Sequence, residues 1–323
     1  MNVFATLALF IVLLSSDMPV AAAQSYPNRP VKILVGGVAG SVPDALVRPV
    51  AERLAGSLGQ PVVVENRPGA AGILAMEALV RSAPDGYTLA VSTMSQAVFN
   101  PYLFSKLPYD PLRDLEAVAP LATGAMVLAA NTAFEGTSLR DVVEIAKCEP
   151  GRLFIAMPQN GAPPHIVALL LNRSLGITPT MVPHKSGAEA IAAVISGQIP
   201  LVIEAPTLIA PQVRAGRLKA ILVTGRERER ELPDVPTARE LGLAVDGGAA
   251  WIGLVAPKGT PKAIVDRLNR ELARVLGTPD MQAMLDRMSF RPLRASPDEF
   301  TATIVRDHAR WSEVIRSANL RLD

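Results

Sequence analysis

Short apolar runs alternate with helix-like segments along most of the chain, and this alternation constrains the fold more than any other feature. The apolar runs predict strands at 31–35, 62–65, 87–92, 126–131, 153–157, 179–183, 201–204, 218–224 and 251–256. Helical spacing of apolar residues predicts helices near 44–58, 72–82, 138–147, 163–175, 187–197 and 207–215. The pattern is typical of an α/β architecture with largely parallel sheets, and 323 residues are enough for two lobes.

The last part of the chain is different because it is nearly all helical from Pro261 onward, with a second long helix near 297–318. The sequence contains no repeat, no low-complexity tract and no long linker. We therefore expect the chain to pass between the lobes near residues 125 and 250. The predicted lobe 1 comprises 24–124 plus 250–323, with the helical C-terminal segment packed on it, and the predicted lobe 2 comprises 125–249.

The first 23 residues have the features of a secretory signal peptide. An apolar stretch at 4–14 precedes the small-residue cleavage sequence Ala21-Ala22-Ala23. The stretch is too short for a transmembrane helix, although the usual basic residues before it are missing. We predict cleavage after residue 23 and a periplasmic mature protein.

Composition argues against several classes of function. The formal net charge is +2 and no basic stripe stands out, so nucleic-acid binding has no support. The sequence has one cysteine, Cys148, which excludes an intramolecular disulfide and a metal–thiolate cluster. The three histidines, His165, His184 and His308, are not at metal-ligand spacing, so we expect no metal.

Familiar catalytic and cofactor motifs are absent from the sequence. It has no Walker A loop, no dinucleotide fingerprint near the first strand, no Gly-x-Ser-x-Gly elbow and no His-Glu-x-x-His. We therefore predict a protein without catalytic activity or cofactor. An enzyme whose site is assembled from distant residues, such as Ser95 or Ser186 with His184, stays open as an alternative.

The segment 36–54 combines a strand end, a small-residue turn and a helix start. Free backbone N–H groups and the positive end of a helix dipole make such a turn a common anion site. Ser41 and Asp44 have the spacing of a capping box, with Ser41 as N-cap. The local sequence therefore predicts an anion-binding turn between 36 and 44.

Eight stretches in a fixed order carry a family resemblance. They are "YPNRPVKILV", "LGQPVVVENRPGAAG", "APDGYTLAVST", "NPYLFSKLPYDPLRDL", "EPGRLFIA", "GRLKAILVTG", "LPDVPTARELGL" and "GLVAPKGTPKAIVDRLN". From about Tyr26 to the C-terminus the chain resembles the extracytoplasmic solute receptors of tripartite tricarboxylate transporters, also called Bug receptors. The resemblance implies a type II-like periplasmic binding protein with a ligand cleft between two α/β lobes.

The resemblance also implies a function. Such receptors close their lobes on a small organic acid and deliver it to a transporter with a large and a small integral membrane subunit. It implies no catalysis, no cofactor and no nucleic-acid partner, and we expect a monomer. Two alternatives stay open: a sensory receptor that signals ligand presence to a membrane partner, and an enzyme on the same scaffold.

In the family, two loops from opposite lobes hold a ligand carboxylate, and they correspond here to 36–44 and 157–165. Polar residues at other strand ends extend the predicted site, because α/β folds bind ligands at the carboxyl ends of strands. The predicted ligand-binding residues are Val38, Ala39, Gly40, Ser41, Asp44, Thr93, Ser95, Gln96, Gln159, Asn160, Gly161, His165, His184, Lys185 and Glu204. Asp44 is also readable as a helix cap, and His165 as a residue satisfied by backbone.

Both loops depart from the family pattern. The first lacks the usual aromatic and proline residues before Gly40, and the second has lost several hydroxyl side chains and carries Pro163 and Pro164. Fewer hydroxyl and N–H donors are then available to a ligand. We hypothesise a less polar or larger acid than citrate or malate, or a receptor whose transport role has decayed.

Overall fold

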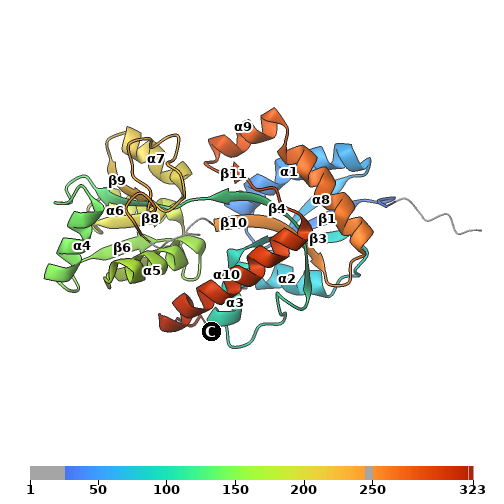
Figure 1. Cartoon of the computed structure of the whole chain (residues 1–323), viewed down its shortest axis with the longest axis horizontal. Helices are drawn as coiled ribbons and strands as arrows, with labels where there is room; N and C mark the ends of the chain where they lie inside the picture. Colours follow the sequence, from blue (N-terminus) through green and yellow to red (C-terminus); the bar gives the residue numbers. More distant parts are fainter. Residues whose placement is uncertain (1–25, 244–249, 319, 323) are drawn as a thin grey trace, which may run out of the picture.

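The computed structural model describes residues 26–243, 250–318 and 320–322. The predicted signal peptide, 1–23, lies outside the described residues. Two sheets with flanking helices lie side by side along the long axis of the molecule (Figure 1). The predicted two-lobe α/β fold is therefore confirmed. The prediction of largely parallel sheets is wrong, because β10 and β11 in one sheet and β5 in the other pair with their neighbours in antiparallel fashion.

The first lobe contains a six-stranded sheet in the order β11-β4-β10-β3-β1-β2. Its strands are β1 (Val31–Val35), β2 (Val62–Asn66), β3 (Thr88–Thr93), β4 (Leu115–Gly124), β10 (Ala250–Pro257) and β11 (Arg291–Pro292). β1 pairs in parallel with β2 and β3, whereas β10 runs antiparallel between β3 and β4. One face packs on α1 (Val42–Leu58), α8 (Lys262–Leu276) and α9 (Pro279–Arg287), and the other on α2 (Ile73–Val80).

The second lobe contains a five-stranded sheet in the order β7-β6-β8-β5-β9. Its strands are β5 (Val127–Asn131), β6 (Phe154–Met157), β7 (Thr180–Pro183), β8 (Leu201–Glu204) and β9 (Leu218–Val223). β6 is parallel to both neighbours, and β5 is antiparallel to β8 and β9. The helices α4 (Leu139–Cys148) and α5 (Pro163–Leu175) cover one face, and α6 (Gly187–Ile195) and α7 (Pro206–Arg214) cover the other.

The longest strand, β4, was not predicted from the sequence. Its sequence is rich in alanine and contains Pro120, which cannot donate a ladder hydrogen bond. Pro120 pairs with Gly253 where the register between β4 and β10 shifts, so the irregularity accommodates the missing N–H. A short π-helical turn at Ser95–Phe99 and the following α3 (Asn100–Leu103) were also not predicted.

The C-terminal helix α10 (Pro297–Ser317) packs on the first lobe, as predicted, and also reaches the second (Figure 1). Near its start, the ring of Phe300 lies 5.0 Å from that of Trp251 in an edge-to-face contact. Towards its end, α10 contacts α5, and Glu313 forms an ion pair with Arg173 of that helix. One apolar cluster therefore contains residues from both lobes and from α10.

Candidate functional site

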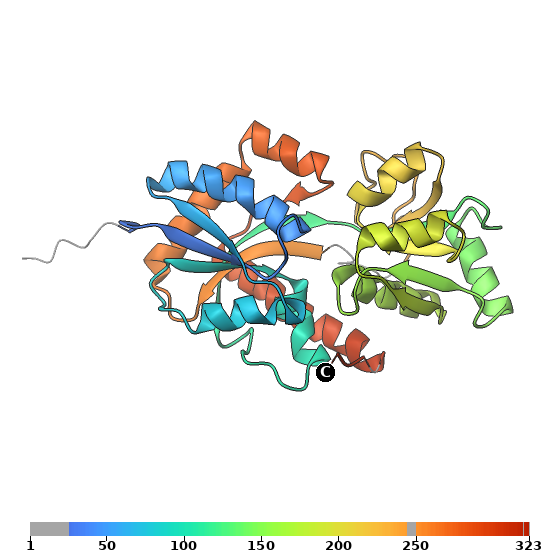
Figure 2. The ribbon, with the colours of Figure 1, turned by 180° about the vertical axis from the view of Figure 1, so that it is seen from behind.

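β1 is parallel to β3 in the first lobe, and β6 is parallel to β7 and β8 in the second, so the carboxyl ends of these strands lie at one edge of each sheet. Figure 2 shows the start of α1, which follows β1, on the side of its lobe that faces the other lobe. The hydroxyl of Ser95, after β3, donates to the carbonyl oxygen of Gly161, after β6, over 3.4 Å. Loops from the two lobes therefore meet at strand ends, where α/β folds bind ligands.

The loop between β1 and α1 is held by the carboxylate of Asp44. Gly40 has a φ of 78°, which favours glycine, and its N–H donates to Asp44 Oδ2 over 2.8 Å. Arg48 Nε donates to the same oxygen over 2.9 Å, and Asn66 Nδ2 donates to Asp44 Oδ1 over 2.9 Å. These bonds, led by that from Arg48, lower the pKa of Asp44 to about 2. Asp44 therefore orders the loop as an ionised group.

The prediction of a capping box at the start of α1 is wrong, because its hydrogen bonds are not formed. Ser41 is the N-cap residue, but its side chain caps no backbone N–H. Arg48 and Asn66 draw the Asp44 carboxylate to the N–H of Gly40, one residue before the N-cap. The buried Ser41 Oγ is left without a hydrogen-bond partner. Within the described residues, this hydroxyl at the start of α1 therefore forms no hydrogen bond.

The loop between β6 and α5 is built in the same way with a neutral side chain. Gly161 has a φ of 76°, and its N–H donates to His165 Nδ1 over 3.1 Å. Burial leaves His165 only 3% exposed and lowers its pKa to about 4. Pro163 and Pro164 occupy the first turn of α5, so this turn lacks two N–H donors.

The remaining polar residues after β3 are mostly paired within the first lobe. Gln96 Oε1 accepts from Thr93 N over 2.9 Å and from Thr93 Oγ1 over 2.7 Å. Gln96 Nε2 donates to Ala71 O over 2.9 Å. Thr93 and Gln96 thus stabilise the loop from which Ser95 contacts the other lobe.

The second lobe contributes residues from two further strand ends. Gln159 Nε2 donates to the carbonyl oxygen of exposed Lys185 over 3.3 Å, which joins the loops after β6 and β7. His184 Nδ1 lies 3.0 Å from Val182 O, within its own loop. Glu204, at the end of β8, is only 7% exposed, and burial raises its pKa to about 7 against the effect of a hydrogen bond from Ala205 N.

The structure thus places the fifteen predicted residues at strand ends, on the loops that follow them, or in the first helical turn after those loops, as for Asp44, Ser95, Gln96 and His165. Val38, Ala39 and Asn160 are exposed there. The hypothetical pairing of His184 with Ser95 or Ser186 is not formed: Ser95 bonds Gly161 O, and the hydroxyl of Ser186 accepts from Glu189 N.

Sequence reasoning missed two residues that shape the first loop. Arg48 lies four positions after Asp44, a helical spacing that could have revealed the pair. Asn66 lies at the end of β2, and no local pattern links it to Asp44.

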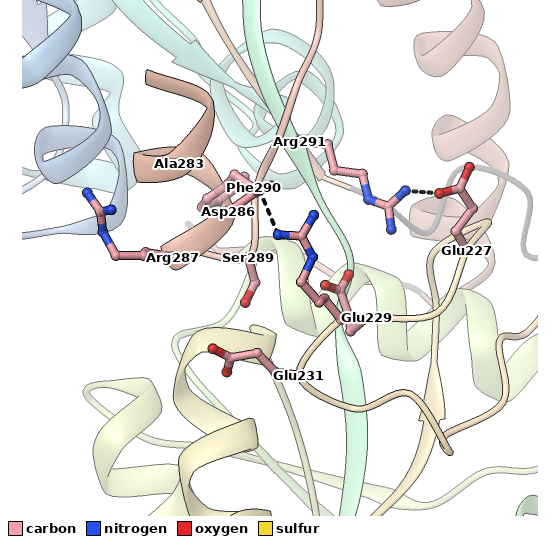
Figure 3. Close-up of a pocket in the computed structure, with 10 residues that line it drawn as sticks. Glu227, Glu229, Glu231, Ala283, Asp286, Arg287, Ser289, Phe290 and Arg291 are labelled. Carbon is pink, nitrogen blue, oxygen red and sulfur yellow. Dashed lines mark hydrogen bonds and ion pairs between the residues drawn. The ribbon is translucent and has the colours of Figure 1, made fainter. Parts of the chain in front are cut away.

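A separate cavity of about 600 Å³ lies between the lobes at another place (Figure 3). Its lining includes Glu227, Glu229, Arg230, Asp286 and Arg291 and none of the predicted site residues. Arg230 Nη1 lies 3.0 Å from Asp286 Oδ2, and Arg291 pairs with Glu227, so ion pairs cross from lobe to lobe here. This cavity is lined mainly by charged groups that already have partners.

The described residues offer neither a metal-binding cluster nor a membrane-spanning helix. They contain no group of three or more His, Cys, Asp or Glu side chains placed to hold a metal ion. Among the helices of this same part of the chain, none has the length and apolarity needed to cross a membrane.

Comparison with known proteins identifies the family. Residues 46–320 match the model of the tripartite tricarboxylate transporter family receptor, TctC. The chain belongs to this receptor family. Protein BugT of Bordetella pertussis is 31% identical over 322 residues, which cover 99% of this chain and 98% of BugT. The resemblance stated from the eight sequence stretches is therefore confirmed.

Solved structures of relatives agree with this fold. MatC of Rhodopseudomonas palustris with bound malate is 33% identical to this chain. The match covers 90% of this chain and all of MatC, with a TM-score of 0.77. R. palustris Rpa4515 with adipate is 29% identical. The match covers 92% of this chain and all of Rpa4515, with a TM-score of 0.80. Proteins of this family are periplasmic solute receptors.

Proposed function

We propose that this protein is a periplasmic receptor that captures a small organic acid between its lobes and delivers it to a tripartite membrane transporter. The observation that carries the proposal is the pair of facing loops at 36–44 and 157–165. Each follows a parallel strand, turns at a glycine with positive φ and leads into a helix N-terminus. The positive ends of both helix dipoles then favour an anion between them.

A carboxylate is the anion that best fits this arrangement. Two relatives that superpose on the chain carry malate and adipate, as stated above. In this chain the Ser41 hydroxyl is an unpartnered donor at the start of α1. The remaining predicted residues after β3, β6, β7 and β8 would contact the rest of the acid.

The surroundings of the loops favour an acid with an apolar body. Val38, on the first loop, is 62% exposed, and Val42 in the first turn of α1 is also exposed. Leu208, in the first turn of α7, is exposed beside Gly187 on the second lobe. An apolar ligand surface would cover these side chains, which supports a larger or less polar acid than citrate or malate.

Closure would occur by rotation of the lobes about the two passages of the chain between the sheets. We assign 24–124 plus 250–323 to lobe 1 and 125–249 to lobe 2, with hinges near 125 and 250. The protein is proposed to act as a monomer, without cofactor and without catalysis, after cleavage of residues 1–23.

A ligand screen tests the proposal. The protein purified from the periplasm of an expression host is screened by thermal shift against mono- and dicarboxylates of four to ten carbons, and hits are titrated calorimetrically. A ligand that binds only the folded protein raises Tm. We expect one acid class to bind in a 1:1 ratio, and no response to any acid would contradict the proposal.

A variant in the first loop shows whether a hit binds at the proposed place. Ser41→Ala removes the unpartnered hydroxyl, and Ser312→Ala removes the hydroxyl of a half-buried serine of α10, which donates to Ala309 O, as a control. We expect about a fivefold loss of affinity in the first variant only. Equal affinities in both variants would place the ligand elsewhere.

A further inference from the structure

The side chain of Glu204 is a buried carboxyl with only one polar partner in the described part of the chain. Its Oε1 accepts a hydrogen bond of 2.7 Å from the N–H of Ala205, the next residue. Its Oε2 lies against Gly187, the first residue of α6, so closely that a Cβ there would be 2.2 Å away. Oε2 has no hydrogen-bond partner among the described residues and is not one of their fully buried polar atoms, so a solvent molecule or a ligand group can reach it. Holding a carboxyl in a place that is only 7% exposed costs free energy, which points to a function.

No charged group compensates Glu204. The elements around it are β5, β6, α5, α6, α7 and the loop before α6. Their ionisable side chains are those of His165, Arg173, His184, Lys185, Glu189 and Arg214. Within the described residues none of these forms a hydrogen bond or ion pair with Glu204. Five of them bond to other groups, namely Gly161 N, Glu313, Val182 O, Lys185 N and Glu231.

Glu204 Oε2 lies where a bound ligand could contact it. β8 is parallel to β6, so Glu204 lies at the same sheet edge as the loop 157–165. Gly187 leaves the carboxyl uncovered by a side chain on the α6 side, and Leu208 flanks it. Under the proposed function, the ligand carboxylate lies at the loops, and the rest of the ligand extends along this edge.

We propose that Glu204 determines specificity by accepting a hydrogen bond from a hydroxyl or ammonium group of the ligand. This inference rests on the proposed function and narrows its ligand to hydroxy acids or amino acids. A site that satisfies a buried polar group through the ligand rejects analogues that lack the matching donor. A second carboxylate at this position would instead repel the ionised Glu204.

The protonation state of Glu204 makes the affinity for an amino acid ligand depend on pH. Burial raises its pKa to about 7, so near neutrality the carboxyl is present in both forms. An ammonium donor binds the ionised form, and binding below the pKa must first release a proton. Affinity for an amino acid ligand therefore rises with pH from 6 to 8, by about tenfold.

The experiment compares acids that share a carbon skeleton. For each of several four- to eight-carbon acids, the unsubstituted, hydroxy and amino forms are titrated into the protein at pH 6, 7 and 8. The same titrations are made on Glu204→Gln and on Glu144→Gln, which removes an exposed carboxyl of α4 in the same lobe. Glu204→Asp keeps the charge and serves as a second variant, and circular dichroism checks the fold of each.

We expect at least one hydroxy or amino acid to bind about tenfold more tightly than its unsubstituted form in the native protein and in Glu144→Gln. In Glu204→Gln the amino-acid preference and the rise with pH should disappear, whereas Glu204→Asp should keep part of both. Equal binding of substituted and unsubstituted acids, or an equal loss for all of them in Glu204→Gln, would overturn the role of Glu204 and leave the receptor function standing. Failure of every acid to bind would overturn the receptor function itself.

Discussion

The loops after β1 and β6 have the same construction but are held by different chemistry. In each, a glycine with positive φ donates its N–H to a side chain four residues later on the following helix. The first loop uses the carboxylate of Asp44, which needs Arg48 and Asn66 beside it. The second uses the neutral imidazole of His165, whose ring is buried.

The difference shows two ways of ordering a loop beside an anion site. A carboxylate accepts strong hydrogen bonds, but its charge opposes an anionic ligand unless a cation such as Arg48 compensates it. A buried neutral histidine adds no charge and needs no partner ion. Both solutions use one glycine N–H for internal bonding, so the donors left to a ligand come from elsewhere in each loop.

Alanine in place of each glycine would break the likeness between the loops. At Gly161 a Cβ would lie 2.7 Å from Leu322 Cδ1 and 2.9 Å from Leu103 Cδ1, in addition to the strained φ. At Gly40 nothing lies within 4 Å. We expect Gly161→Ala to lower the free energy of unfolding by about 3 kcal/mol and Gly40→Ala by about 1 kcal/mol. Urea denaturation measures both, and equal losses would refute the packing argument.

Acid should weaken the two loops in different pH ranges. Because burial lowers the pKa of His165 from 6.5 to about 4, the unfolded chain binds its proton first as pH falls, and about 3 kcal/mol of stability is lost between pH 6.5 and 4. Asp44, with a pKa of about 2, loses its contribution only between about pH 4 and 2.

Variants of His165 and Asp44 test which residue causes the loss of stability in each pH range. His165→Asn does not titrate and offers an oxygen near the place of Nδ1, so the difference in unfolding free energy from the native protein should shrink between pH 7 and 4. Asp44→Asn should show a difference that is constant over that range and shrinks only below pH 4. Urea denaturation at a series of pH values measures both, and identical profiles would contradict the assignment.

Removal of the Asp44 side chain should lower the free energy of unfolding more than removal of its ion-pair partner does. Asp44→Ala leaves the N–H of Gly40 without its acceptor and removes one of the two acceptors of Asn66 Nδ2, which keeps its bond to Gly37 O, and we expect a loss of about 2 kcal/mol. Arg48→Met, which removes the exposed partner and keeps the aliphatic stem, should cost less than Asp44→Ala, because solvent screens an exposed charge. Thermal and urea denaturation measure both, and the reverse order would mean that the ion pair, not the loop bonding, stabilises this region.

The smallest expected effect concerns the helix caps. Ser41→Ala removes a hydroxyl that caps nothing, so stability should change by less than about 0.5 kcal/mol. Ser186→Ala, at the start of α6, removes the acceptor of Glu189 N and should cost about 1 kcal/mol. A loss of 1 kcal/mol at Ser41, measured in the same denaturation series, would show that its hydroxyl does cap α1.

The sequence predicted well those elements whose signals are local. Strands such as 31–35 consist mostly of branched apolar residues, and α5 begins with its two prolines, so both elements were found within a few residues. β4 was missed because Pro120 and the alanines around it carry no strand signal, and only pairing with β10 and β11 makes them a strand. The reach of α10 to α5 was missed because it depends on how the two lobes meet.

The candidate site divides along the same line. Strand ends and the resemblance to the receptor family predicted two loops, 36–44 and 157–165, and the structure has these loops on facing edges of the lobes. The bonding within them was not predictable, since Asp44 depends on Asn66, which is distant in sequence, and Glu204 on its closeness to Gly187. These contacts exist only once the sheets are assembled.

Hydrogen exchange tests the central claim most directly. Backbone amides are monitored by mass spectrometry with and without an acid identified in the screen, and three regions are compared: 36–44, 157–165 and the lining of the cavity around Glu229. We predict that the acid protects both loops together, because the ligand joins the lobes there. Protection confined to one loop, or to the segments 227–231 and 283–291 around that cavity, would contradict the account.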